Sequence, residues 1–272
     1  MDKKLLEKVK IIRDMTQIGY GSCVEALEKN DANIEKAIEW LKKQGIAKNA
    51  ISSKETKEGI VKSICNEKSG IIFEVNCQTD FVAKNDSFCK LIDDFAKKCL
   101  ETEEIITFEQ AKELFFSMFS LIISAIKEKI VFYRFERIYK KESESFGFYN
   151  HMGKISAIVI LEKRDDVLAK EIAVHVASNN VRYLNFEDID KKIIDKEREI
   201  ISENLKNDEK MNSKSKEMID KIITAKIHKN MSQFVLSEQN FLYDESHKVS
   251  YFLNNNRVIS FFKYVLNEQT TI

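Results

Sequence analysis

The order strand, turn, strand, helix and returning strand occurs twice in this chain of 272 residues, and no other feature constrains the fold as much. In each copy a hairpin comes first, a helix with an apolar face follows, and a further strand lies later in the chain. The strands are predicted at 60–65, 71–77 and 130–138 in the first copy, and at 145–150, 154–161 and 257–265 in the second. Two such units predict an α+β fold with duplicated core subdomains, each burying a sheet face under helices.

The helices of the first copy carry strong local signals. Phe88 and Phe95 belong to an apolar stripe at helical spacing, which predicts a helix packed on the first sheet. Thr107 and Gln110 have the spacing of a capping box, so a second and more apolar helix is predicted from 108 to about 129.

The second copy contains an insertion between its helix and its last strand. Leu168 and Ile172 mark the apolar face of the helix, and His175 shares this face, which favours a core histidine over a contact residue. Within 185–231, narrow apolar stripes amid dense Lys and Glu predict an antiparallel hairpin of two helices, separated by 207–213.

A small helical module precedes the two copies. Residues 3–44 predict three short helices, the third ending at Gly45, a natural residue to follow a helix. The predicted domains are a three-helix module (1–46), a linker (47–58), a core N-subdomain (59–140), a core C-subdomain (141–184 and 232–267), the inserted helical hairpin (185–231) and a short tail (268–272).

Composition argues against several classes of protein. Lys and Arg together number 44, as do Asp and Glu, so no net field favours nucleic acid or an anionic membrane, and a ribosome-associated RNA-binding protein is disfavoured. The five cysteines include no C-x-x-C pair, which indicates reduced thiols rather than disulfides or a zinc site. We find no signal segment and no apolar run near the ~18 residues of a membrane span, so a soluble, cytoplasmic protein is expected.

Motifs of catalysis and of nucleotide binding are absent from the sequence. Neither G-x-x-x-x-G-K-[ST] nor G-x-G-x-x-G occurs. The histidines, His151, His175, His228 and His247, include no pair four residues apart that could share a metal on a helix. We therefore expect no enzymatic activity, no cofactor and no metal site.

Residues 74–85 form the most informative segment. An apolar strand ends in a polar cluster, where Thr79 or Asp80 can cap a helix that starts with Phe81. One interpretation is an exposed corner that presents a carboxylate and an aromatic ring to a partner's pocket. The other is a helix cap followed by a core phenylalanine, and the residues alone leave both open.

Residues 75–84, Val-Asn-Cys-Gln-Thr-Asp-Phe-Val-Ala-Lys, resemble the signature of the elongation factor Ts family, the guanine-nucleotide exchange factors of elongation factor Tu. Weaker matches follow the family's order at 16–23, 151–153 and 236–241. The family also has an N-terminal module like the ubiquitin-associated domain, a duplicated α+β core and an inserted helical hairpin. The resemblance thus covers essentially the whole chain.

The resemblance implies a function in translation elongation. In the family, the residues at Asp80 and Phe81 lie against the GTPase domain of elongation factor Tu, and the ring wedges between helices beside the Mg²⁺ site, which promotes GDP release. A heterodimer, or a dimer of two heterodimers, is implied. The implied contact residues are Thr79, Asp80, Phe81, Val82, Ala83 and Lys84 at the corner, His151, Met152 and Gly153 in the second hairpin, and Ile18, Gly19 and Tyr20 in the N-terminal loop.

This chain departs from the family pattern at several positions. Gln17 and Lys127 stand where the family has glycine, and Lys127 is expected to hinder a close backbone approach to the partner. For His151, a polar turn residue is an equally good interpretation. Since the chain stops at Ile272, little room remains for the C-terminal helical module of many bacterial members, and a smaller interface is expected. Lys127 and the short C-terminus leave an alternative function open, in which the chain binds and stabilises elongation factor Tu without promoting nucleotide exchange.

Overall fold

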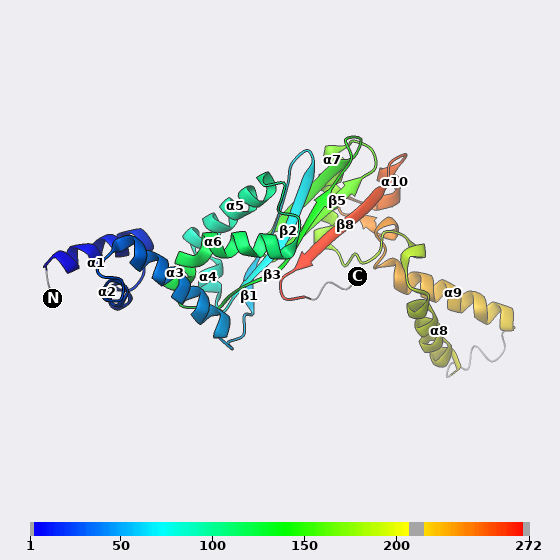
Figure 1. Cartoon of the computed structure of the whole chain (residues 1–272). Coiled ribbons are helices and arrows are strands. Elements are labelled where there is room, and N and C mark those ends of the chain that lie inside the picture. The colour runs from blue at the N-terminus through cyan, green and yellow to red at the C-terminus, as the bar shows by residue number, and fades with distance from the viewer. Residues whose placement is uncertain (1–2, 207–214, 269–272) are drawn as a thin grey trace. The chain divides into compact units, whose positions relative to one another are not determined.

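The computed structural model describes residues 3–206 and 215–268, and Figure 1 follows their helices and strands along the chain. Helices alternate with small sheets, which confirms the predicted α+β class. The chain divides into two compact units: the first is Met1–Lys140, Asn150–Ser156 and Tyr264–Gln269, and the second is Lys141–Tyr149, Ala157–Lys263 and Thr270–Ile272.

The first unit opens with the predicted three helices, α1 (Lys3–Thr16), α2 (Tyr20–Glu28) and α3 (Ile34–Ile51). Their apolar faces meet in a small core of their own. The predicted end of the third helix at Gly45 is wrong, because α3 continues to Ile51. Residues 52–57 then lead to the first strand.

Gly45 serves helix packing rather than helix termination. The helix α6 (Phe108–Ile126) packs so closely on α3 that a Cβ added at Gly45 would lie 1.8 Å from Ser124 Oγ. Ser124 Oγ also donates a hydrogen bond to the carbonyl of Leu41 in α3, at 2.9 Å. A glycine inside a helix allows this approach, which larger residues would prevent.

The first sheet contains β1 (Glu58–Cys65), β2 (Ser69–Cys77) and β3 (Ile130–Tyr139), paired antiparallel in the order β1-β2-β3. The predicted strands and the hairpin between β1 and β2 are confirmed. The helices α5 (Asp86–Glu101) and α6 cover one sheet face. Their shared core is rich in phenylalanine: Phe73, Phe88, Phe95, Phe115, Phe119 and Phe132.

Strand β2 is buried along its whole length. On the helix-covered face, Phe73 packs edge-to-face on Phe95, with ring centroids 5.1 Å apart. On the opposite face Glu74 has 0% exposure and pairs with Arg134 at 2.6 Å. The Glu74 carboxylate also accepts a hydrogen bond from the Asn267 backbone N–H at 3.0 Å. Because a buried charge requires a partner, this pairing is what allows β2 to be covered on both faces.

The predicted capping box at the start of α6 is confirmed. Thr107 Oγ1 accepts from the Gln110 N–H, and Gln110 Oε1 accepts from the Thr107 N–H at 3.0 Å. The helix ends at Ile126, three residues before the predicted end at about 129, because Lys127 takes a left-handed backbone with φ of 59°. Gln17, the other position where the family has glycine, is left-handed too, also with φ of 59°. Both family glycines are thus explained by backbone conformation.

The second sheet repeats the pattern of the first. Its strands are β4 (Ser145–His151), β5 (Ile155–Leu161) and β8 (Val258–Val265), in the order β4-β5-β8. The helix α7 (Asp166–Ser178) packs so closely on β4 that a Cβ at Gly147 would lie 1.8 Å from the Ala169 carbonyl oxygen. The predicted strands and helix of the second copy are confirmed.

The insertion contains the predicted pair of helices, α8 (Lys191–Lys206) and α9 (Lys216–Ser232), which pack on each other (Figure 1). Their apolar stripes form a separate small core. The predicted separator 207–213 and, of the predicted tail, residues 269–272 lie outside the described residues. Short elements that we did not predict follow α9: β6 (Asn240–Phe241), β7 (Asp244–Lys248) and α10 (Val249–Leu253).

His175 is a core histidine, as predicted, with 0% exposure. The Leu242 N–H donates to its Nδ1 at 3.2 Å, so the proton of the neutral ring is on Nε2, which donates to Gln239 Oε1 at 2.8 Å. Burial lowers the pKa of His175 below its ordinary value, although the hydrogen bond with Gln239 opposes this shift. The neutral form therefore belongs to the folded state.

We predict that Gly45→Ala lowers the free energy of unfolding by about 1–3 kcal/mol, because the new methyl group overlaps Ser124. Gly21→Ala in α2 is the matched control, since a Cβ there meets nothing within 4 Å. The control is expected to gain up to about 1 kcal/mol from helix propensity. Urea denaturation followed by circular dichroism measures both, and an equal gain in the two variants would contradict the packing argument.

Lys127→Gly is expected to raise the free energy of unfolding by about 0.5–1 kcal/mol. Glycine removes the strain of the left-handed backbone, and this gain exceeds the larger conformational entropy that glycine loses on folding. Lys129→Gly tests the reason, since Lys129 is not among the residues with positive φ. Thermal denaturation of both variants provides the comparison. Destabilisation by Lys127→Gly would show that the lysine side chain outweighs the backbone strain.

The low pKa of His175 predicts a pH-dependent stability. The unfolded chain takes up the proton near the ordinary value of 6.5, before the folded chain does. The contribution to stability is therefore complete above pH 6.5 and is lost as the pH falls below it toward the folded pKa. In His175→Gln the dependence should be shallower by up to about 1.4 kcal/mol per pH unit in this window. If urea denaturation gives the same slope of unfolding free energy against pH for the wild type and for His175→Gln, the role of His175 in this pH dependence is refuted.

Candidate functional site

The predicted corner is a separate turn of helix. β2 ends at Cys77, α4 (Asp80–Ala83) follows, and Asn85 then caps α5 by accepting the Phe88 N–H at 3.0 Å. The helix predicted to start with Phe81 starts one residue earlier, at Asp80, and lasts a single turn, because the second cap begins a new helix. The corner thus lies between a buried strand and an amphipathic helix.

Phe81 is 82% exposed, whereas its neighbour Val82 is 6% exposed and belongs to the core under the first sheet. The interpretation of Phe81 as a core residue is thereby excluded. Because a fully buried phenylalanine gains about 1.5–3 kcal/mol, its exposure leaves that free energy available to a partner. Val82 anchors the turn from below with a buried side chain, and its predicted contact with a partner stays a prediction.

Asp80 and Lys84 lie on the outer surface of this turn and form an ion pair at 2.7 Å. The hydrogen bond from Lys84 and the charge of its ammonium lower the pKa of the Asp80 carboxyl, and the same hydrogen bond with the charge of the carboxylate raises the pKa of Lys84. Both groups therefore keep their charge at neutral pH. The corner presents one apolar ring beside a fixed carboxylate and ammonium.

Thr79 is the N-cap residue of α4, as one predicted alternative had it, but its side chain makes no capping bond. Its hydroxyl instead donates toward Glu128, with oxygens 2.9 and 3.1 Å away, and its backbone N–H donates to Glu128 Oε2 at 3.2 Å. The Cys77 thiol donates to the Thr79 carbonyl at 3.2 Å, and burial raises the pKa of this thiol to about 12, so it stays protonated.

The second predicted segment is the turn between β4 and β5. Met152 and Gly153 have φ of 49° and 68°, and the Lys154 N–H donates to the His151 carbonyl at 2.9 Å, which describes a tight two-residue hairpin turn. Met152 is 86% exposed. Its left-handed conformation holds the side chain on the surface of the turn.

The structure brings this turn to the Phe81 corner. A cavity of about 270 Å³ is lined by Asp80, Ala83 and Lys84 from the corner and by Met152 and Gly153 from the turn. The Gly153 carbonyl also accepts the Val61 N–H of β1 at 2.8 Å, which fixes the turn beside the first sheet. Two of the three predicted contact segments therefore share one surface of the first unit.

The third predicted segment, Ile18 to Tyr20, is only partly accessible. Ile18 is 1% exposed in the core of the helical module, and its predicted contact with a partner stays a prediction. Gly19 is the exposed N-cap of α2, and Tyr20 is 42% exposed. A Cβ added at Gly19 would lie 3.9 Å from Lys127 Nζ, so this loop lies beside the C-terminal end of α6.

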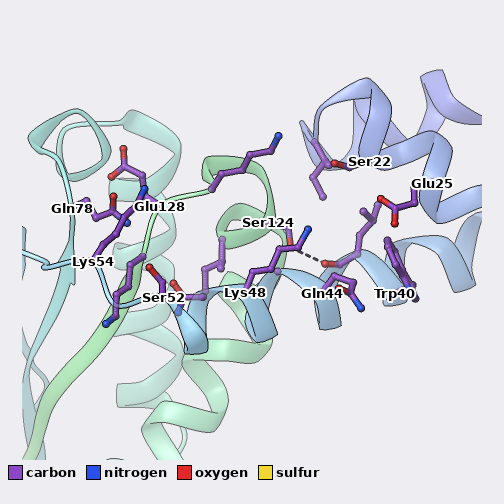
Figure 2. A pocket seen from close by; sticks show the side chains of 17 residues that line it. Ser22, Glu25, Trp40, Gln44, Lys48, Ser52, Lys54, Gln78, Ser124 and Glu128 are labelled. Carbon is purple, nitrogen blue, oxygen red and sulfur yellow. Dashed lines mark hydrogen bonds between the residues drawn. The ribbon is translucent and has the colours of Figure 1, made fainter.

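Sequence reasoning missed a second cavity, of about 290 Å³, between the helical module and the rest of the first unit. Figure 2 shows Trp40, Gln44 and Lys48 on α3 and, at the other end, Gln78 and Glu128 next to the corner. Figure 2 also draws the hydrogen bond of Ser124 to α3. The lining residues come from distant segments, so no local pattern could reveal them.

The described part of the chain shows no group of three or more His, Cys, Asp or Glu residues that could hold a metal ion. Across residues 3–206 and 215–268, none of the helices is both long and apolar enough to cross a bilayer. Burial raises the pKa of Cys65 to about 12 and that of Cys99 to about 11, which makes these thiols poor nucleophiles.

Comparisons with known proteins agree with the corner signature. Residues 78–268 match the family model described as elongation factor TS. The chain is 31% identical to elongation factor Ts of Phytoplasma australiense, over 97% of this chain and 98% of the relative. It is 32% identical to that of Acholeplasma laidlawii and 31% identical to that of Pediococcus pentosaceus, each over 96% of this chain and 91% of the relative. The chain therefore belongs to the elongation factor Ts family, whose members are nucleotide exchange factors of translation elongation.

Proposed function

We propose that this chain binds elongation factor Tu in its GDP form and promotes release of GDP, which allows GTP to bind in its place. The observation that carries the proposal is the 82% exposure of Phe81 beside the charged pair of Asp80 and Lys84. Membership of the elongation factor Ts family supports the same partner. The proposal includes cytoplasmic action, no bond chemistry by the chain itself, and no nucleic acid or membrane partner.

In the proposed mechanism, the Phe81 ring enters a crevice between helices of the GTPase domain beside its Mg²⁺ site. The ring displaces groups that hold Mg²⁺ and the β-phosphate, which are the strongest electrostatic anchors of the nucleotide. Because binding free energies are linked, a factor that prefers the nucleotide-free partner must lower its GDP affinity by the same ratio. Exchange is therefore driven by binding energy.

The surface around Phe81 supports this mechanism. Aromatic residues buried at the centre of an interface commonly contribute 2 kcal/mol or more, roughly a factor of 30. Met152, 86% exposed across the shared cavity, offers a second apolar contact on the same face. The fixed charges of Asp80 and Lys84 favour one docking orientation over others.

The expected hindrance by Lys127 stays a prediction, and the structure adds a local reason for glycine at this position. Its backbone ends α6 in the left-handed conformation that the family's glycine also suits, so the substitution affects local strain. Binding without exchange remains an outcome of the experiment below. We also propose a heterodimer, or a dimer of two heterodimers, which light scattering of the purified complex distinguishes by mass.

Phe81→Ala is expected to slow the release of a fluorescent GDP analogue from elongation factor Tu by about 10- to 100-fold relative to the wild-type chain, because the wedge is lost. Stopped-flow fluorescence at several concentrations of the chain measures this rate. Tyr139→Ala is the matched control, since Tyr139 is a 54% exposed aromatic at the end of β3. The control should exchange at the wild-type rate.

Two results would contradict the proposal. A wild-type chain that forms a stable complex without accelerating release would favour a stabilising role. Equal acceleration by wild type and Phe81→Ala would show that exchange depends on some other surface.

A further inference from the structure

We propose that Glu128 is the positioning residue that holds the Phe81 corner in its exposed geometry, and that helix α3 in turn holds the segment carrying Glu128. This inference rests on the proposed exchange function, because it concerns how the wedge is presented. It assigns a role to a residue 49 positions away from Thr79 in the sequence.

The corner needs a positioning group because α4 is too short to be stable by itself. A helix of four residues makes almost no hydrogen bonds of its own, and isolated short helices are unstable in water. Its direction must therefore be set by tertiary contacts at its ends. Val82 anchors the middle in the core, and Asn85 fixes the C-terminal side by capping α5.

Glu128 provides the contacts on the N-terminal side. Its carboxylate accepts both the backbone N–H and the hydroxyl of Thr79, at 3.2 and 2.9 Å. Two donors from one residue onto one carboxylate fix both the position and the rotation of that residue. Since Thr79 directly precedes Asp80 and Phe81, its rotation determines the direction in which the ring leaves the surface.

Glu128 is itself held in place by α3. Its segment, 127–129, connects α6 to β3, and both ends of the connection bind the helical module. On one side Ser124 Oγ donates to the Leu41 carbonyl at 2.9 Å. On the other, the side chain of Asn49 accepts the Ile130 N–H at 2.6 Å and donates to the Ile130 carbonyl at 2.7 Å.

Asn49 is a buried side chain that satisfies both backbone groups of a single residue, so it fixes the chain one residue after Lys129. The left-handed Lys127 fixes the turn on the opposite side. The helical module therefore has a role besides any surface it offers to a partner: it stiffens the loop that orients the wedge.

The first test uses the free protein and measures hydrogen exchange of the Thr79 amide by NMR. Glu128→Ala is expected to speed this exchange by about tenfold or more, because a hydrogen bond to a charged acceptor is lost. Glu113→Gln, at an exposed glutamate of α6, is the matched control and should leave the rate unchanged. Unchanged Thr79 exchange in Glu128→Ala, with the fold intact by circular dichroism, overturns the proposal.

The second test is a double-mutant cycle in the GDP-release assay at saturating concentrations of the chain. Glu128→Ala should slow release about tenfold in the wild-type background and have no further effect when Phe81 is already alanine. A structural role alone would produce additive losses and a lower unfolding midpoint. If the wild-type chain promotes exchange, Phe81→Ala abolishes it and Glu128→Ala leaves it unchanged, this inference is refuted but the proposed function is not. If the wild-type chain does not promote exchange, the proposed function itself is refuted.

A third variant tests the role of α3. Asn49→Ala should speed exchange of the Thr79 amide as Glu128→Ala does, and the double variant should be no faster than either alone. Additive effects, or normal protection of Thr79 in a folded Asn49→Ala protein, would overturn the part of the proposal that concerns α3.

Discussion

Burial of β2 on both faces is the constraint on which the rest of the structure depends. One face packs on the phenylalanine cluster of α5 and α6, and the other requires the paired charges of Glu74 and Arg134. A strand held from both sides has a fixed end at Cys77. The turn that follows therefore starts from a rigid point, and three further contacts, by Glu128, Val82 and Asn85, are enough to orient Phe81.

Much of the fold could be predicted because its signals are local. Two hairpins, the capping box at Thr107 and the apolar stripes of the helices each depend on residues within one or two turns of the chain. Elements set by tertiary contact were missed. Gly45 has the sequence context of a helix end, yet its helix continues to Ile51. The glycine is explained by packing instead, because α6 leaves room only for a hydrogen atom at this position. The strand β6 is too short to show an alternating pattern, and β7 shows none because all five of its residues are polar.

The candidate site was predictable only in part. Elementary chemistry left both a core position and an exposed position open for Phe81, and the family signature, not periodicity, favoured exposure. The burial of Ile18 and Val82 could not be read from a motif that names contact residues without their side-chain directions. The pairing of Thr79 with Glu128 joins segments far apart in the sequence, so no spacing rule reveals it. The left-handed backbones of Gln17 and Lys127 explain why glycine suits these positions without reference to a partner.

The central claim is that Phe81 converts binding energy into loss of GDP, and calorimetric titration tests it most directly. The affinity of the chain is measured for GDP-bound and for nucleotide-free elongation factor Tu, with wild type and with Phe81→Ala. Coupling between such sites is typically about 5- to 150-fold. The account predicts that the wild-type chain prefers the nucleotide-free form by a ratio in this range and that Phe81→Ala brings the ratio close to one. An unchanged ratio in the variant would contradict the account.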